Sequence, residues 1–329
     1  MTTTPAKTIE ISSYLRAEEE RTLADDVLDG LTRPFKELPP KHLYDARGSE
    51  LFDLICEQPE YYPTRTETAI LRERGDEIAA TTRAAELVEL GAGSVDPKTR
   101  ALLDALSAAG TLARYVPVDV SESTVRASAA VVAGEHPGVA VHGMVGDIER
   151  HLDHLPAPAG PRVLAFLGGT VGNFLPGARR RFLRDLAGRV QPEDHLLIGT
   201  DLVKDPSVLE AAYNDAAGVT AAFNANLLTV MNRELGATFD LGAFEHVAFF
   251  DRDREWIDIR LRALARQWVD VPALDLAIDF RAREEMRSEI STKFTRARVE
   301  GDLAAAGLEL AAWLTDPHGL YALSLARLR

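Results

Sequence analysis

The middle of the chain alternates between short apolar runs and longer stretches in which apolar residues recur at helical spacing. Short apolar runs bounded by glycine, proline or polar residues predict strands, and the stretches between them predict helices. Strands are expected at 85–90, 113–119, 138–144, 162–167 and 195–200, and helices near 97–108, 122–134 and 177–189. This alternation predicts an α/β fold in which helices cover both faces of a mostly parallel sheet.

The rhythm changes after Asp201. A long helix is expected over 207–234, strands at 245–251 and 255–266, an extended run at 274–280, a helix near 295–307, and two last strands at 308–314 and 321–328. The simplest assembly treats 202–292 as an insertion that forms a second domain together with the first 65 residues. We expect that domain to lie over the strand tips, with a small-molecule site in the cleft between the domains.

A glycine turn follows the first of these central strands. Leu87–Leu90 runs directly into Gly91-Ala92-Gly93, and the next strand ends in Asp119. Glycine allows a sharp turn and a close approach to a ligand, and ligands bind at the carboxyl ends of strands in such sheets. A carboxylate at Asp119 can accept both hydroxyls of a ribose. The turn lacks the third glycine of the dinucleotide fingerprint and the Gly-Lys-Ser/Thr ending of a phosphate loop, so a plain strand-helix turn is the alternative.

Composition narrows the class of protein. The 329 residues are 46% hydrophobic and 27% charged, which is typical of a soluble enzyme. A formal net charge of −14 argues against a protein that grips nucleic-acid phosphates, and the basic run at 179–181 is typical of a solvated helix face. Cys56 is the one cysteine, which rules out an intrachain disulfide. With no signal segment and no apolar run of membrane-spanning length, we expect a cytoplasmic protein without membrane contact.

Further clusters carry candidate chemistry, each with a structural alternative. Asn173 follows the fourth strand and suits an amino-acid headgroup or a helix cap, and Asp147 suits an adenine amino group or a cap. The tandem tyrosines at 61–62 lie between prolines that could simply staple a loop. If residues 289–294 are extended, Glu289 and Ser291 share one face and can take both nitrogens of an imidazole, although a solvated strand face is the alternative.

Taken together, these clusters resemble the histidine-specific Nα-methyltransferase family, whose members make the trimethylhistidine precursor of ergothioneine. The resemblance covers nearly the whole chain. It is carried by the segments 38–49, 60–67, 87–100, 166–173, 199–205, 213–224 and 289–294.

The resemblance implies a class I methyltransferase (Rossmann-like) fold, with a seven-stranded sheet and a second α+β substrate-binding domain. The domain that binds S-adenosylmethionine would span 66–201 and 293–329, and the substrate-binding domain would span 1–65 and 202–292.

It also implies the site residues. Tyr44 would lie near the reacting amine and the cofactor and would orient the amine. The residues that match substrate contacts are Tyr61, Asn173, Tyr213, Ile259, Glu289 and Ser291, and those that match cofactor contacts, besides Tyr44, are Gly91, Lys98, Asp119, Asp147 and Ile148. This chain departs from the family pattern in a longer loop from Gly91 to Lys98, in Ile148 for a phenylalanine and in Ile259 for a methionine.

The implied reaction is three successive methyl transfers from S-adenosyl-L-methionine to the α-amine of L-histidine, the first step of ergothioneine biosynthesis, without a metal. We expect a monomer. A related methyltransferase acting on tryptophan or a tryptophan derivative is the alternative within the wider family. A non-catalytic sensor of the cofactor and a nucleic-acid methyltransferase are the alternatives outside it.

Overall fold

The computed structural model describes residues 9–16 and 21–329, which group into two compact units. The first unit comprises the described residues of Met1–Glu19 with Pro63–Leu202 and Phe294–Arg329. The second unit comprises the described residues of Glu20–Tyr62 with Val203–Lys293. The expected substrate-binding domain includes all of residues 1–65, whereas residues 9–16 and 63–65 group with the first unit. Residues 1–8 and 17–20 of that range lie outside the described residues.

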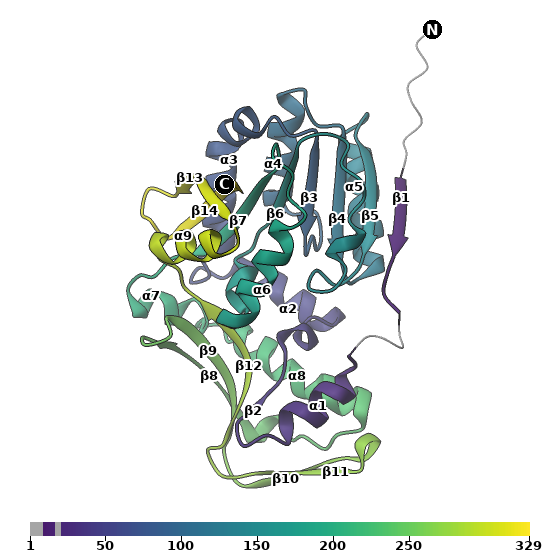
Figure 1. Ribbon diagram of the computed structural model, residues 1–329. Coiled ribbons are helices and arrows are strands. Elements are labelled where there is room, and N and C mark those ends of the chain that lie inside the picture. Colours follow the sequence, from purple (N-terminus) through teal and green to yellow (C-terminus); the bar gives the residue numbers. More distant parts are fainter. Residues whose placement is uncertain (1–8, 17–20) are drawn as a thin grey trace. The chain divides into compact units, whose positions relative to one another are not determined.

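The first unit is built on one mixed sheet with the strand order β1-β5-β4-β3-β6-β7-β14-β13 (Figure 1). Its strands are β1 (Ile9–Ser13), β3 (Glu86–Leu90), β4 (Arg114–Asp119), β5 (Ala140–Val145), β6 (Arg162–Phe166), β7 (His195–Asp201), β13 (Leu308–Thr315) and β14 (Tyr321–Leu328). The neighbours from β1 to β7 pair parallel, and the terminal hairpin β13-β14 pairs antiparallel with β7.

The seven expected strands of the sheet are present, which confirms the α/β class I methyltransferase fold. The eighth strand, β1, was not expected. Its residues pair in register with β5, Ile9 opposite Val141 and Ser13 opposite Val145, so this segment extends the edge of the sheet. A five-residue edge strand carries too short an apolar pattern to stand out in the sequence.

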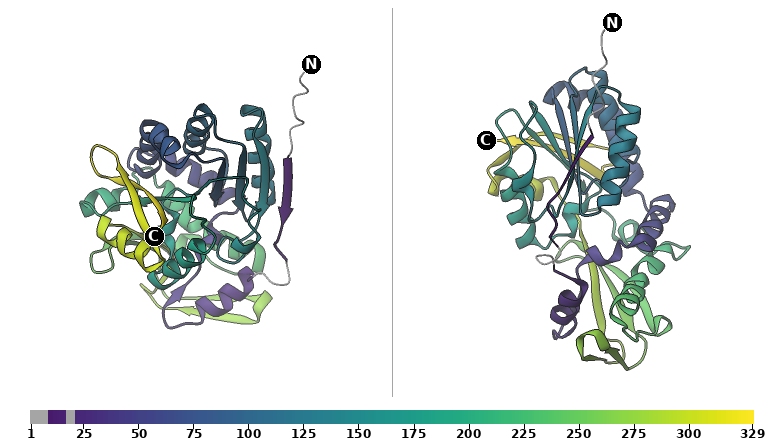
Figure 2. Two further views of the ribbon diagram at one scale, coloured as in Figure 1. Left: turned by 45° about the horizontal axis from the view of Figure 1, so that its top comes forward. Right: turned by 90° about the vertical axis from the view of Figure 1, so that its right-hand side faces the viewer.

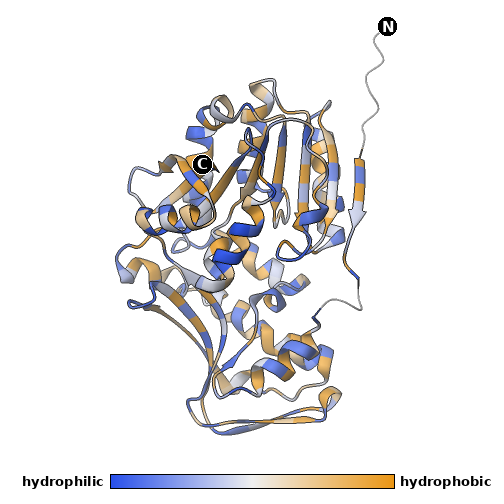
Figure 3. Cartoon of the chain, in the orientation of Figure 1, coloured by the Kyte–Doolittle hydropathy of each residue, from blue (hydrophilic) through white to orange (hydrophobic). Residues whose placement is uncertain are grey.

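Helices cover both faces of this sheet, as the turned view in Figure 2 shows. One face packs against α3 (Pro63–Thr82), α4 (Pro97–Ala108) and α5 (Glu122–Glu135). The other face packs against α6 (Pro176–Ala187) and α9 (Arg296–Ala305). Neighbouring strand residues such as Leu87 and Val88 join opposite cores, and both are fully buried. Strands buried on both faces read as continuous apolar runs, and Figure 3 shows them largely in the hydrophobic colour.

The second unit combines a four-stranded sheet, ordered β2-β12-β9-β8, with a hairpin and several helices. Its strands are β2 (Lys36–Glu37), β8 (Phe244–Asp251), β9 (Trp256–Ala263), β10 (Gln267–Val271), β11 (Leu276–Phe280) and β12 (Glu285–Thr292). Its helices are α1 (Leu23–Leu31), α2 (Ala46–Glu57), α7 (Pro206–Ala211) and α8 (Val219–Leu235). The short 3-10 helices η1 (Pro40–Leu43) of this unit and η3 (Thr170–Asn173) of the first unit precede or carry candidate site residues.

The single long helix expected over 207–234 is wrong. The structure has two helices, α7 and α8, separated by a turn that contains Tyr213 and ends at Gly218, whose φ is 74°. Asp215 accepts hydrogen bonds from the backbone N–H groups of Val219 and Thr220, both at 2.7 Å, and so caps the second helix. Aspartate before a glycine in the left-handed region is the local signal for this break.

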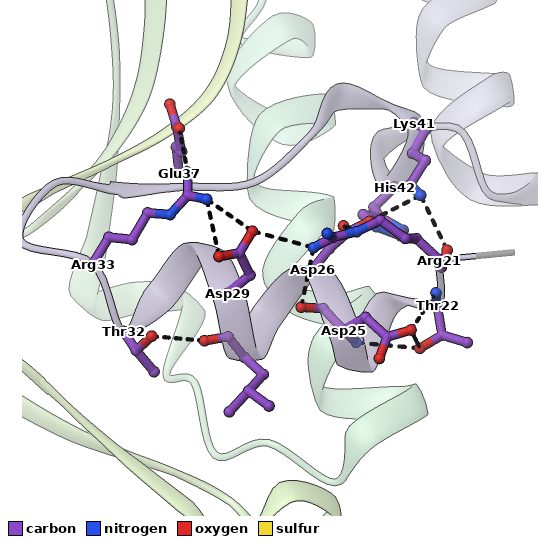
Figure 4. A network of polar contacts seen from close by, with 11 residues as sticks. Arg21, Thr22, Asp25, Asp26, Asp29, Thr32, Arg33, Glu37, Lys41 and His42 are labelled. Atoms are coloured by element: carbon purple, nitrogen blue, oxygen red, sulfur yellow. Dashed lines mark hydrogen bonds and ion pairs between the residues drawn. The ribbon is translucent and has the colours of Figure 1, made fainter. Parts of the chain in front are cut away.

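A polar network ties α1 to the segment that leads to Tyr44 (Figure 4). The Asp26 carboxylate, 5% exposed, accepts from His42 Nε2 at 2.8 Å and pairs with Lys41 at 2.9 Å and Arg21 at 2.8 Å. Burial opposes ionisation of Asp26, but the hydrogen bonds from Lys41, His42 and Arg21 hold its pKa below the usual value. Burial lowers the pKa of His42, so a neutral imidazole donates to Asp26. The network therefore fixes η1, the element directly before Tyr44.

Across 9–16 and 21–329, we find no helix with both the length and the apolar content needed to cross a membrane.

The buried ion pair at the base of β6 yields a stability prediction. Arg162 and Asp194 are 3% and 1% exposed, and the guanidinium donates to the carboxylate at 2.9 and 2.7 Å. Asp194→Ala leaves a buried cation without this partner, so we expect the free energy of unfolding, measured in urea, to fall by about 3–5 kcal/mol. Glu135→Ala removes the exposed partner of Arg100 and should cost at most about 1 kcal/mol. Equal losses for the two variants would contradict the argument.

Candidate functional site

The glycine turn after β3 forms a cradle at the strand tips of the first unit. Gly91 and Gly93 have φ values of 65° and 57°, which only glycine adopts readily, and a Cβ built on either would meet nothing within 4 Å. Asp119 ends β4 beside this turn, and its carboxylate accepts from the N–H groups of Gly93 at 3.0 Å and Ser121 at 2.9 Å. Each of its oxygens has a second lone pair, so the carboxylate fits the diol of a ribose.

The next strand tip carries Asp147 and Ile148. Asp147 accepts from the N–H of Glu149 at 2.8 Å, and its own N–H donates to His151 at 3.0 Å, so the structural alternative of a local cap is present. This bond uses one oxygen of the carboxylate and leaves the other for an amino group. Ile148 is half-buried and packs against the core beneath the tip. The two residues offer an acceptor and an apolar surface, which is what an adenine needs.

Lys98 belongs to a buried charge cluster at the same tips. Its ammonium, 13% exposed, lies 3.4 Å from Glu67 and 3.2 Å from Asp96. Burial opposes its charge, but Glu67 and Asp96 raise the pKa of Lys98 above the usual value. Asp96 also caps α4 by accepting from the N–H groups of Lys98 and Thr99. Despite the longer loop, Lys98 is therefore held at the first turn of α4, charged.

Glu67 is a residue that the sequence reasoning missed. It has no exposed surface, and its carboxylate accepts from the Gly168 N–H at 2.8 and 3.1 Å and from the Tyr321 hydroxyl at 3.1 Å. A Cβ at Gly199 would lie 2.0 Å from this carboxylate, so only glycine fits there. The acid links α3 to the loop after β6, the loop that leads to Asn173. Asn173 itself is half-buried as the last residue of η3 and occupies no cap position, since Gly169 and Phe174 flank η3 and Leu175 precedes α6.

Glu89 is a second buried acid of this unit. It is 5% exposed and accepts from the hydroxyls of Tyr115 at 2.6 Å and Thr99 at 2.7 Å. Burial raises the pKa of Glu89 to about 7. An acid two residues before a glycine turn is the sequence signal for such a residue.

In the second unit, β12 presents candidate substrate residues on one face. Glu289 pairs with Ile259 and Ser291 with Ile257 across the antiparallel ladder. The extended conformation on which the shared face depended is thus present, and the alternative of a solvated face does not hold for Ser291, which is 8% exposed. Ile259 is 4% exposed and supplies the apolar neighbour of Glu289.

Tyr213 and Ser291 meet directly. Their hydroxyl oxygens are 2.8 Å apart, and the ammonium of Lys293 donates to both. The Tyr213 backbone carbonyl accepts from His246 Nε2 at 2.9 Å, and Asn224 donates to the other ring nitrogen at 2.9 Å. Burial lowers the pKa of His246, which keeps the ring neutral for these two bonds. Asn224 and His246 therefore fix the backbone of the turn that carries Tyr213.

Aromatic rings connect the remaining candidates. The Tyr61 ring packs edge-on against Tyr213 and Phe52, with centroid distances of 6.1 and 6.3 Å. The Tyr44 ring packs edge-on against Phe52 and Phe223, with centroid distances of 5.6 and 5.3 Å. Exclusion of water and the nearby Glu289 carboxylate raise the pKa of Tyr44, and the same two causes contribute for Tyr61. Both phenols therefore stay protonated and can donate hydrogen bonds.

Tyr44 is fixed from both sides along the chain. The network around Asp26 anchors the residues before it, and Asp45 anchors those after it. The Asp45 carboxylate accepts from Gly48, Asn226 and Arg233 at 2.7–2.8 Å, which caps α2 and ties it to α8. Tyr44 keeps 42% of its surface exposed, so the residue is partly open to solvent although protein atoms surround its hydroxyl group.

The candidate residues thus divide between the two units. The first unit holds Gly91, Lys98, Asp119, Asp147, Ile148 and Asn173, and the second holds Tyr44, Tyr61, Tyr213, Ile259, Glu289 and Ser291. The sequence reasoning missed Glu67 and Lys293 and gave Glu89 no role. The alternation Glu289-Ser291-Lys293 is the signal that would have found Lys293.

The raised pKa of Glu89 predicts a pH dependence of stability. A carboxyl group whose pKa is raised in the folded protein binds its proton more tightly there, so stability falls as pH rises from about 4.5 to about 7. Glu89→Gln removes this loss. We expect the variant to gain on the order of 3 kcal/mol relative to the native chain between pH 5 and pH 8. Urea unfolding at both pH values measures it, and a constant difference between the two proteins would contradict it.

Comparison with known proteins shows the family of the chain. The family model described as "Histidine-specific methyltransferase, SAM-dependent" matches residues 23–328.

Relatives named "Histidine N-alpha-methyltransferase" are 52% identical. One, from Mycolicibacterium smegmatis, aligns over 97% of this chain and 99% of its own length, and one, from Mycobacterium tuberculosis, over 92% and 94%. "Ergothioneine biosynthesis protein 1" of Neurospora crassa is 32% identical over 89% of this chain and 34% of its own length. A family model that spans almost all of the described residues leaves one conclusion: the chain belongs to the histidine-specific, S-adenosylmethionine-dependent methyltransferases.

Proposed function

We propose that this protein transfers three methyl groups in succession from S-adenosyl-L-methionine to the α-amine of L-histidine, giving Nα,Nα,Nα-trimethylhistidine. The observation that carries the proposal is the face of β12 in the second unit, where a carboxylate and a hydroxyl stand side by side among apolar neighbours. An imidazole offers such a pair two ring nitrogens, one that donates to the carboxylate and one that the hydroxyl can bind in either direction. The names of the relatives support histidine as substrate, and the name of the Neurospora relative supports a role in ergothioneine biosynthesis.

The first unit would bind the methyl donor. The open turn at Gly91 and Gly93 would let the donor approach the backbone closely. Asp119 would accept hydrogen bonds from the ribose hydroxyls, and Asp147 and Ile148 would bind the adenine. Lys98, kept charged by Glu67 and Asp96, would pair with the amino-acid carboxylate of the donor. When bound, the donor supplies an electrophilic methyl group on a sulfonium.

The second unit would bind the acceptor. Glu289, Ser291 and Tyr61 would bind the imidazole, and Tyr213 would hold the carboxylate. The hydroxyl of Tyr44, protonated because its pKa is raised, can orient the amine but is a poor base. Its role is therefore positioning.

Energetics support positioning as the main contribution. An α-amino group has a pKa near 8, and somewhat higher in a free amino acid, so its deprotonation at neutral pH costs about 2–3 kcal/mol. Orientation of two reactants is worth about 7–11 kcal/mol. The amine needs no strong base if the residues around it fix its lone pair toward the methyl group.

Glu289→Ala tests the specificity argument. Loss of a hydrogen bond to a charged group costs about 1.5–3 kcal/mol, so kcat/KM for histidine should fall about ten- to hundredfold while binding of S-adenosylmethionine, measured by calorimetry, stays unchanged. Glu245→Ala is the matched control, because Glu245 is a half-exposed glutamate of the same sheet paired with Arg262. Unaltered histidine kinetics in the Glu289 variant would refute the assignment.

The reaction itself is tested by incubating the protein with S-adenosylmethionine and a mixture of histidine and tryptophan. Mass spectrometry should show histidine gaining three methylene units and tryptophan unchanged. Accumulation of a singly methylated product would contradict trimethylation, and modified tryptophan would favour the alternative substrate. Relatives named for 4-dimethylallyltryptophan are 28% identical to this chain, so the comparison is a fair one.

A further inference from the structure

A lysine with no exposed surface lies behind the candidate histidine site. Lys293 follows β12 directly, and its Nζ donates to the Tyr213 hydroxyl at 2.9 Å and to the Ser291 hydroxyl at 2.8 Å. The Nζ also lies 4.6 Å from the centroid of the Tyr213 ring. Burying an ammonium group is costly unless it is paired and hydrogen-bonded, so its place beside two hydroxyls calls for a reason.

The chemistry of the ammonium sets the direction of both hydroxyls. An ammonium donates and never accepts, so each oxygen turns a lone pair toward Lys293. The hydroxyl protons of Tyr213 and Ser291 must therefore point away from it. A residue without a hydrogen-bond donor in the same place would remove this restriction on the two hydroxyls.

The two hydroxyls also restrict each other. Their oxygens are 2.8 Å apart, so one of them donates to the other. The pair has two protons and this bond uses one, which leaves at most one proton for a ligand. A carboxylate can only accept, so a carboxylate bound at Tyr213 takes that proton, and Ser291 then donates to Tyr213. In this state Ser291 offers a ligand a lone pair.

We propose that Lys293 is a positioning residue that orients the hydroxyls of Tyr213 and Ser291, so that the carboxylate and the ring of the amino-acid substrate are recognised as one coupled set. This rests on the proposed function, since it takes histidine as the ligand. Lys293 itself need not touch the substrate.

Lys293→Met tests the proposal because methionine fills a similar volume and donates no hydrogen bond. We expect KM for histidine to rise at least tenfold, kcat to change less than threefold, and binding of S-adenosylhomocysteine to stay unchanged. Lys36→Met is the matched control. Lys36 is also buried in the second unit, where it pairs with Glu284, and its loss should leave KM unchanged. An unchanged KM in Lys293→Met overturns the proposal.

A double-mutant cycle separates orientation from general support of the fold. In a Ser291→Ala background one of the two oriented hydroxyls is absent, so Lys293→Met should raise KM by a factor at least threefold smaller than in the native chain. Equal factors in the two backgrounds would show that Lys293 acts independently of Ser291 and would overturn the proposal. If the methionine variant does not fold, Lys293→Leu, which also donates no hydrogen bond, replaces it under the same criterion.

Assays of the native chain separate a failure of the role proposed for Lys293 from a failure of the proposed function. If the native chain methylates histidine and the lysine variants keep its KM, only the role of Lys293 falls. If the native chain binds S-adenosylhomocysteine but neither binds nor methylates histidine, the proposed function falls, and the role of Lys293 with it.

Discussion

The alternation of side chains along β12, with one interruption, is the constraint on which the second unit's site depends. The ladder with β9 pairs Arg287 with Arg260 and then Glu289 with Ile259, so Ser288 is the extra residue of a β-bulge. Before the bulge, Arg287 lies on the face of Asp258 and Arg260 and joins their ion pairs. After it, Glu289 lies on the face of the isoleucines. A strand without this bulge would place Glu289 among the arginines.

The bulge thus separates two uses of charge on one small sheet. On one face, carboxylates and guanidiniums neutralise each other in a network that includes Glu285 and Arg262. On the other face, Glu289, Ser291 and Lys293 stand among apolar side chains. A charge is far more selective for its ligand in an apolar surrounding than within a network of opposite charges, because fewer alternative partners compete for it. The bulge therefore separates the charged face of this sheet from the face that carries Glu289 without any substrate being bound.

The first unit treats buried charge in a related way at its strand tips. Glu67 and Glu89 are both buried acids beside turns that contain glycine, and both accept hydrogen bonds from groups on other elements. Loops at strand ends are held mainly by such polar contacts, since they contribute few apolar side chains to the core. The shape of the cofactor cradle thus depends on residues outside the cradle. Substitutions at these acids are expected to alter the loops before they alter the sheet.

The parts of the fold and of the candidate site that the sequence predicts are those that leave a pattern among residues close together in the chain. The central strands of the main sheet were predicted because they are apolar runs buried on both faces, as Leu87 and Val88 show. The terminal strand β13 is only partly buried and was predicted from its apolar residues. The edge strand at 9–13 was not predicted, because it gains its identity from pairing with β5. The break at Tyr213 was missed although Asp215 and Gly218 are a local signal for it. Site residues were found by resemblance. Glu67 is identified by distant partners, which no spacing reveals, whereas the alternation Glu289-Ser291-Lys293 does point to Lys293.

Discrimination in such a site comes more from what it leaves unpaired than from what it binds. A pocket of apolar groups separates ligands that differ by a methylene only about 10–200-fold, whereas a pocket that buries polar groups rejects a ligand without their partners far more strongly. Glu289 lies beside Ile259, and a ligand whose ring lacks an N–H would leave that carboxylate without the ligand's hydrogen bond in a partly desolvated place. Ser291 and Tyr213 add a second condition, because one hydroxyl donates to the other and the pair has only one proton left to donate to a ligand. Ring and carboxylate must therefore both be correct, which is a stricter requirement than either contact imposes alone.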